Sequence, residues 1–378
     1  MTAVMTRLAG PCRRLVLSLA AGLAFAVPRA VEGADLKPLE AVLVAADAAT
    51  GDRVAGWKRE GFGAVAVVLG DDVAAPALQA AAKAVADNGL ALYVWVEVGR
   101  NPEMARDHPD WVASLGSHDD WRKRFPKARP PGKGEVAKAW PWVPIGYKEA
   151  FDAHLGRAKT LLARVPAGCR GVLLNDLQGG PSSCGCGNAQ CRWATDYGVP
   201  STATRLAGPG VAARFVAEVG KLAPGQEVVP VWTTECEAED LPADKLPKGG
   251  WGTGYCGGVE CLATCRKRYA EQWAALHADR TGPTGLLLLH KEFGRDRGEY
   301  GGPAAWVAQG VGYAEKAGAE PVAASRLWVV VQGYGVPADE AAAARRVAVK
   351  LGPKVVLVAR TPLDQSYEPR VVPVKSAR

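Results

Sequence analysis

The sequence predicts a (β/α)8 barrel, an α/β fold in which eight parallel strands alternate with helices within one domain. Eight short runs along the chain are apolar throughout, as expected for parallel strands that are buried on both faces. Amphipathic stretches lie between them, and several of these end at glycine, a typical helix stop signal. Strand–helix alternation of this kind, repeated about eight times, is typical of a closed barrel.

The predicted strands span 40–46, 63–70, 90–98, 170–176, 227–235, 284–292, 326–334 and 354–360. The clearest helical patterns are 75–89, 210–223, 265–278 and 338–352. A glycine-rich run at 249–258 is a further strand candidate, so the predicted count is eight or nine. A doubly wound open sheet is the alternative, but no glycine-rich phosphate loop follows the first strand, which disfavours its nucleotide-binding form.

The N-terminus has the pattern of a secretory signal peptide. Three arginines precede the apolar run LVLSLAAGLAFAV at 15–27, and small residues follow near Gly33. A membrane anchor is the alternative, but this run is short for a bilayer span. We therefore expect a signal peptide at 1–33, a single barrel domain at 34–378, and a secreted or periplasmic protein without stable membrane insertion after cleavage.

The charge pattern does not indicate a nucleic-acid partner. The formal net charge is +7, and four of the arginines behind this excess lie within the predicted signal segment. No basic run interleaved with exposed aromatic residues is apparent. The sequence does not indicate an oligomeric state.

Acidic residues stand at or near the ends of several predicted strands. They are Asp47, Glu97, Asp176, Glu235 and Glu292. In a barrel, these ends meet at one mouth, where enzymes of this fold build their sites. When carboxyl groups lie close together, their pKa values move apart, so one can act as an acid while another acts as a base. The alternative for each residue is a helix cap or an ion pair with a lysine or arginine.

A long insertion follows the third predicted strand, at 101–151, and it is rich in aromatic residues. Loops this long in a compact domain are usually functional or disordered, and the aromatic content disfavours disorder. Flat aromatic rings can stack on the apolar face of a sugar. The predicted substrate-binding residues are Trp95, His108, Trp111, Trp121, Trp140, Trp142 and Trp232. The alternative is that the rings form a satellite core and that His108 is a hydrogen-bonding loop residue.

A cysteine-rich loop follows the fourth predicted strand. Cys184, Cys186 and Cys191 are its members, and all eight cysteines outside the signal segment lie between 169 and 265. An exported protein permits disulfides, whereas four clustered thiolates would form a structural zinc site. Both interpretations remain open, and both make the cysteines structural. We expect no cofactor for the chemistry itself.

Two motifs resemble glycoside-hydrolase-like barrel proteins. GVLLND at 171–176 precedes the C-x-C…CR cluster, and HPDWVASLG at 108–116 follows VWVEVGRNPEM at 94–104. The second motif resembles a loop of family-10-like glycosyl hydrolases, and clan A β-galactosidases carry a similar cysteine cluster that binds zinc. The resemblance covers roughly 90–193. The whole chain also resembles a secreted bacterial family of unknown function.

The resemblance implies roles for particular residues. Clan A enzymes carry their acid/base in an Asn-Glu pair that ends strand four, which Asn175-Asp176 matches with an aspartate in place of the glutamate. Their nucleophile is a glutamate that ends strand seven, for which Glu292 is the candidate. Aspartate is one methylene shorter than glutamate, so Asp176 would lie further from the second carboxyl group. The distance between the two carboxyl groups is what distinguishes retaining from inverting enzymes.

The expected function is that of a secreted glycoside hydrolase acting on a poly- or oligosaccharide. Asp176 would be the general acid, Glu292 the nucleophile or base, and Asn175 a hydrogen-bond donor to a sugar hydroxyl. Glu97 and Glu235 would support or replace them. The alternatives are a non-catalytic carbohydrate-binding barrel and a structural envelope protein that disulfides or zinc hold together.

Overall fold

The computed structural model describes residues 37–113, 125–146, 148–177, 211–233, 282–291, 302–316, 323–363 and 366–373. The chain falls into two compact units, Met1–Leu36 and Lys37–Arg378, and all described residues belong to the second. The predicted signal segment and the glycine-rich strand candidate at 249–258 lie outside the described residues.

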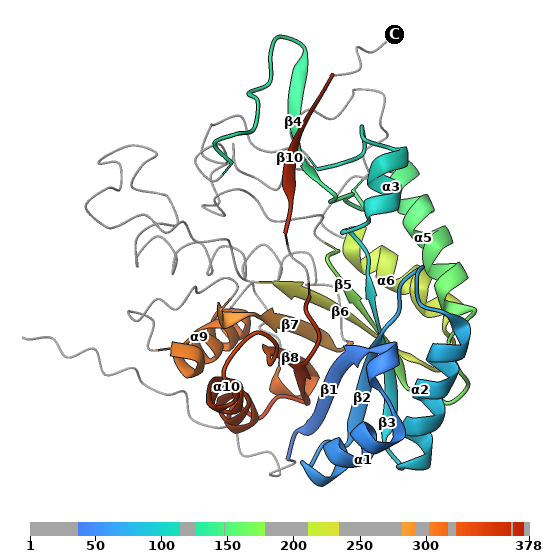
Figure 1. Ribbon diagram of the computed structural model, residues 1–378, viewed down its shortest axis with the longest axis vertical. Helices are drawn as coiled ribbons and strands as arrows, with labels where there is room; N and C mark the ends of the chain where they lie inside the picture. Colours follow the sequence, from blue (N-terminus) through green and yellow to red (C-terminus); the bar gives the residue numbers. More distant parts are fainter. Residues whose placement is uncertain are drawn as a thin grey trace, which may run out of the picture. The chain divides into compact units, whose positions relative to one another are not determined.

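Eight parallel strands close into a barrel, so the predicted (β/α)8 class is confirmed (Figure 1). Each strand overlaps one of the eight predicted apolar runs. Closure is direct, because Leu39 of the first strand pairs with Val355 of the last, and this rules out an open doubly wound sheet. The strands are β1 (Leu39–Ala45), β2 (Ala64–Val68), β3 (Ala91–Glu97), β5 (Gly171–Asn175), β6 (Glu227–Thr233), β7 (Thr284–Leu288), β8 (Leu327–Gln332) and β9 (Val355–Ala359).

Helices cover the outside of the barrel and connect successive strands (Figure 1). Each buries one stripe: α6 buries Phe215 and Val219 against the barrel and leaves Lys221 in solvent. No helix in the described ranges is long and apolar enough to cross a bilayer. The longer helices are α1 (Gly51–Arg59), α2 (Ala75–Asp87), α5 (Lys148–Leu162), α6 (Val211–Leu222), α9 (Gly302–Lys316) and α10 (Ala338–Lys350), with the 3-10 turns η1 (Ala46–Ala48) and η6 (Ala324–Arg326).

A contact across the barrel fixes which side chains point inward. The rings of Tyr93 on β3 and Trp328 on β8 meet edge to face at 5.0 Å between centroids, although these strands are not neighbours. Side chains alternate along a strand, so Trp95 and Glu97 also point into the barrel. The register pairs Glu97 with Asn175 of β5, which therefore faces inward at the same level.

The same register places Trp232 on the outer face of the barrel. Tyr93 pairs with Gly171, and Gly171 pairs with Glu227, so alternate residues of β6 from Glu227 onward face inward. Trp232 is an odd number of residues after Glu227, so its side chain faces outward, and it is fully buried beneath the helices. The prediction that Trp232 binds substrate is therefore wrong, because its indole is part of the layer between strands and helices.

The insertion after β3 folds into structure that the sequence did not predict. It contains α3 (Pro102–Asp107) and β4 (Glu135–Trp140), and β4 pairs antiparallel with the C-terminal strand β10 (Glu368–Pro373), shown in dark red beside it in Figure 1. One face of this small sheet packs in a hydrophobic cluster with Trp142 and Tyr367. The C-terminal segment therefore holds the insertion beside the barrel.

The inward-facing Gly171 leaves no room for a side chain. A Cβ at this position would lie 2.4 Å from the carbonyl oxygen of Glu227, a contact that only movement of the strands could relieve. We expect Gly171→Ala to destabilise the protein by about 1–3 kcal/mol in urea unfolding. Gly220→Ala on α6 is the matched control, because no atom lies within 4 Å of its Cβ. It should stabilise the protein by roughly 0.5–1 kcal/mol, and equal effects of the two variants would contradict the packing.

Candidate functional site

A carboxylate held by two donors lies at the mouth of the barrel. Glu97 ends β3, and its Oε1 accepts a hydrogen bond from Trp95 Nε1 at 2.7 Å. Its Oε2 accepts a second bond from Asn175 Nδ2 at 2.8 Å. Two N–H donors stabilise the negative charge and fix the carboxylate plane. The Glu97 side chain is only half-buried, so the remaining lone pairs of the carboxylate lie near solvent.

Trp95 serves this carboxylate rather than a substrate. Its ring is fully buried within the barrel, and its only polar atom donates to Glu97. The predicted stacking of Trp95 on a sugar therefore does not fit the structure, because no ring face reaches solvent. The indole instead fixes the position of the Glu97 carboxylate from within the barrel, through this hydrogen bond.

Asn175 is fully buried, and its amide oxygen has no hydrogen-bond partner among the described residues. The amide nitrogen donates one of its two N–H groups to Glu97, so within the part of the chain that the structure describes the oxygen is an unpaired acceptor, in addition to the donor role that we expected. A buried acceptor without a partner costs roughly 1–3 kcal/mol. The hydroxyl group of a ligand, or a water molecule, would recover that cost.

Asp176 follows directly and adopts a left-handed backbone conformation, with φ of 60°. Aspartate and asparagine tolerate this conformation better than most residues, and strained backbone often marks functional sites. Its side chain is fully buried. The predicted general acid therefore lies next to the Glu97–Asn175 pair along the chain but is not exposed to solvent.

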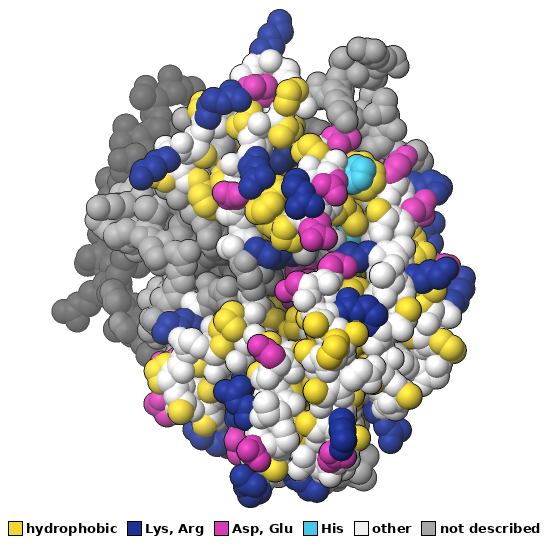
Figure 2. Space-filling view, turned by 45° about the vertical axis from the view of Figure 1, so that its right-hand side comes forward, with side chains coloured by type: hydrophobic (Ala, Val, Ile, Leu, Met, Phe, Trp, Pro, Cys, Tyr) yellow, Lys and Arg dark blue, Asp and Glu magenta, His cyan; other side chains and the backbone are white. Residues whose placement is uncertain are grey.

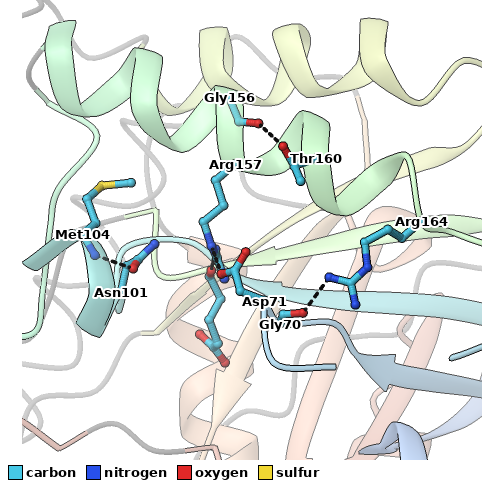
Figure 3. A network of polar contacts seen from close by, with 9 residues as sticks. Gly70, Asp71, Asn101, Met104, Gly156, Arg157, Thr160 and Arg164 are labelled. Atoms are coloured by element: carbon cyan, nitrogen blue, oxygen red, sulfur yellow. Dashed lines mark hydrogen bonds and ion pairs between the residues drawn. The ribbon is translucent and has the colours of Figure 1, made fainter. Parts of the chain in front are cut away.

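Arg157 connects the strand ends from outside the barrel. It extends from α5, donating Nη1 to the carbonyl oxygen of Glu97 at 2.7 Å and Nε to Asp71 at 2.5 Å. Figure 3 shows it beside Arg164, which donates to the carbonyl oxygen of Gly70 at 3.3 Å. Sequence reasoning missed Arg157, because an arginine on an amphipathic helix is normally a solvated residue and nothing local marks this one.

The aromatic rings of the insertion pack against its own residues. Trp111 stacks on His108 with 3.7 Å between centroids and an interplanar angle of 6°, and the Arg370 guanidinium lies 3.7 Å above the ring of Trp140. Trp142 is fully buried. The prediction that Trp142 binds substrate is therefore wrong, and one face of Trp111 and one face of Trp140 are already covered. The alternative, that the rings of the insertion form a satellite core, fits Trp111, Trp140 and Trp142 better.

Several predicted site residues lie outside the described ranges. They are Trp121, Glu235, Glu292, Cys184, Cys186 and Cys191. Glu292 follows the described Lys291, whose backbone N–H donates to Gln332 Oε1 at the end of β8 at 3.0 Å. The role predicted for Glu292 stays a prediction.

Cys169 lies before β5, at the end of the barrel opposite the mouth, and it forms no disulfide with any described residue. Its thiol is buried and donates to the Gly171 carbonyl oxygen at 3.4 Å. Burial raises the pKa of this thiol, which keeps it protonated and unreactive. Within the described ranges, no three His, Cys, Asp or Glu side chains are arranged to hold a metal ion.

The face drawn in Figure 2 carries lysine and arginine side chains interspersed with aspartate and glutamate. Hydrophobic side chains lie among the charges in small groups. No single sign of charge dominates this face, so it offers no broad electrostatic field for a highly charged partner.

The fold and this site define a (β/α)8 barrel with a polar centre at the carboxyl ends of its strands. No protein-family model matches the sequence, nor does any curated protein. Among solved structures, a chitinase from Chromobacterium violaceum shares 11% identity over 79% of this chain and 69% of its own, with a TM-score of 0.37.

Two other solved structures are similar at the same level. Alpha-L-fucosidase isoenzyme 2 from Paenibacillus thiaminolyticus shares 14% identity over 82% of this chain and 48% of its own, with a TM-score of 0.38. Endonuclease IV from Thermus thermophilus shares 12% over 86% and 93%, with a TM-score of 0.37. These scores are too low to transfer an activity, so the fold assignment rests on the strand pairing.

His154 anchors the end of the insertion to α5. Its Nε2 lies 2.8 Å from the carbonyl oxygen of Val143, so Nε2 carries the proton and donates. Nδ1 is buried without a partner among the described residues. Burial lowers the pKa of His154 to about 4, and the nearby positive charge of Arg157 acts in the same direction.

We expect His154 to make the protein less stable as the pH falls from 6.5 towards 4. In this window the unfolded chain binds a proton that the folded chain does not, so the free energy of unfolding falls, by up to about 3 kcal/mol. His154→Gln can still donate to Val143 but does not titrate, so its urea-unfolding free energy should depend less on pH. Identical pH profiles for the two proteins would contradict the assignment.

Proposed function

We propose that the protein is an exported glycoside-hydrolase-like barrel that binds a poly- or oligosaccharide at the mouth formed by β3 and β5. The observation that carries the proposal is the hydrogen bond from Asn175 to the inward-facing carboxylate of Glu97. It places a fixed anion and an unsatisfied amide acceptor on neighbouring strands at the end of the barrel where enzymes of this fold act.

Glu97 suits the role of base or nucleophile better than that of acid. Both of its oxygens accept N–H donors, an arrangement that stabilises the anion and leaves lone pairs for a water molecule or a sugar carbon. This assignment moves the anionic role from Glu292 to Glu97. Asn175, which is fully buried, would hold the Glu97 carboxylate in place beneath the sugar.

Asp176 remains the candidate acid. In hydrolysis with inversion, Glu97 would take a proton from water as the water oxygen bonds to the anomeric carbon. The glycosidic C–O bond would break as Asp176 gives its proton to the leaving oxygen. The aspartate follows Asn175 directly, and its left-handed backbone keeps it at the strand end.

Binding of a carbohydrate without cleavage is the second candidate function. The full burial of Asp176 favours it, because a general acid must reach the leaving oxygen. In that case the Glu97–Asn175 pair would bind sugar hydroxyls, and no bond would break.

Replacing Glu97 with glutamine should reduce hydrolysis at least a hundredfold, measured as release of reducing sugar from a panel of plant, fungal and bacterial glycans. Glu103→Gln is the matched control, since this exposed glutamate belongs to α3 of the same insertion. A melting temperature for each variant separates loss of the site from loss of the fold. Unchanged turnover with Glu97→Gln would remove the catalytic assignment.

Asp176→Asn distinguishes the two candidate functions, because asparagine tolerates the left-handed backbone equally well and lacks the acidic proton. For a hydrolase, cleavage should be lost while glycan binding, measured by calorimetry, is retained. For a binding protein, the native chain should bind a glycan without cleaving it, and Asn175→Ala should weaken that binding about tenfold.

A further inference from the structure

In the part of the chain that the structure describes, no helix follows the last strand of the barrel. β7 and β8 are followed by α9 and α10, whereas the described residues after β9, 360–363 and 366–373, contain no helix and lead into β10. A groove of about 810 Å³ lies beside α10, and its lining extends from Glu60 and Phe62, just after α1, to Val358 of β9.

The groove has the length of a short helix. Its lining includes Ala338 and Lys350, the first and last residues of the 13-residue α10, so it runs the length of that helix. A second helix laid along it would be about 20 Å long.

The wall that α10 presents to the groove combines small apolar side chains with Arg345, whose guanidinium donates to Glu40 and lies over the ring of Phe62. Ala338, Ala341, Ala342 and Val349 line the groove, and their spacing puts them along one stripe of the helix. Alanine side chains allow a second helix to approach closely, and ridges-into-grooves packing needs such a surface. The stripe is therefore shaped for a helix.

The charges around the groove specify an acidic occupant. Glu40 is neutralised by Arg345 at 2.5 Å, and Glu60 pairs with Arg360. Two further lining cations, Arg346 and Lys350, lie four residues apart on α10 without an acidic partner in the part of the chain that the structure describes. Like charges at this spacing destabilise a helix, and a carboxylate of a bound partner would relieve that repulsion.

We propose that this groove binds an acidic amphipathic helix of a partner protein, which lies along α10. The apolar face of the partner packs on the alanine stripe, and its carboxylates, spaced four residues apart, pair with Arg346 and Lys350. This site is on the outside of the barrel and is independent of the carbohydrate function proposed for the mouth.

The test uses fluorescein-labelled 16-residue helical peptides and the purified full chain, with binding followed by fluorescence anisotropy. One peptide carries an alanine–leucine face flanked by two glutamates four residues apart, and the other has lysines in their place. We expect the acidic peptide to bind at least tenfold more tightly than the basic one. R346E/K350E should reverse this preference, whereas R214E, at an exposed arginine of α6, should not change it.

Three results would overturn the proposal. The acidic peptide does not bind saturably, or it binds R346E/K350E as tightly as the native protein, or the basic peptide binds the native protein equally well. Sedimentation tests a second copy of this chain as the occupant. Self-association that R346E/K350E abolishes would show that a second copy of this chain fills the groove, and the proposal would then be wrong.

Discussion

The closed parallel register is the constraint on which the rest of the molecule depends. Because paired residues on neighbouring parallel strands face the same side, one inward-facing ring at Tyr93 determines the orientation of every strand around the barrel. It brings Glu97 and Asn175 to the same level of the mouth and sends Trp232 beneath the helices. Arg157 then holds the carbonyl group of Glu97 in place from α5.

The barrel could be predicted because its signal is local. An apolar run that is buried on both faces looks the same wherever it occurs, so all eight strands appear in the sequence before any pairing is known. The β4–β10 sheet could not be predicted, because its strands are far apart in the chain and neither is strongly apolar. Its stability comes from the cluster around Trp142 and Tyr367, which exists only after the two strands have met.

The sequence could indicate some of the residues that form the site, but not what each of them does there. The sequence pointed to Glu97 because it ends a predicted strand, but it could not show that Asn175 on the neighbouring strand donates a hydrogen bond to Glu97. Aromatic residues were harder, because a tryptophan that packs in a core and one that binds a sugar have the same local pattern. Trp142 and Trp232 belong to the first kind, and only their burial reveals it.

The pairing of β4 with β10 makes the insertion beside the mouth dependent on a strand that is synthesised after all eight strands of the barrel. Until β10 emerges, β4 lacks its described partner, while β1, β2 and β3 can already associate with one another. The insertion beside the mouth is thereby completed only after the barrel strands have been made. A chain without β10 could retain a barrel and yet be unable to hold the insertion beside its own opening.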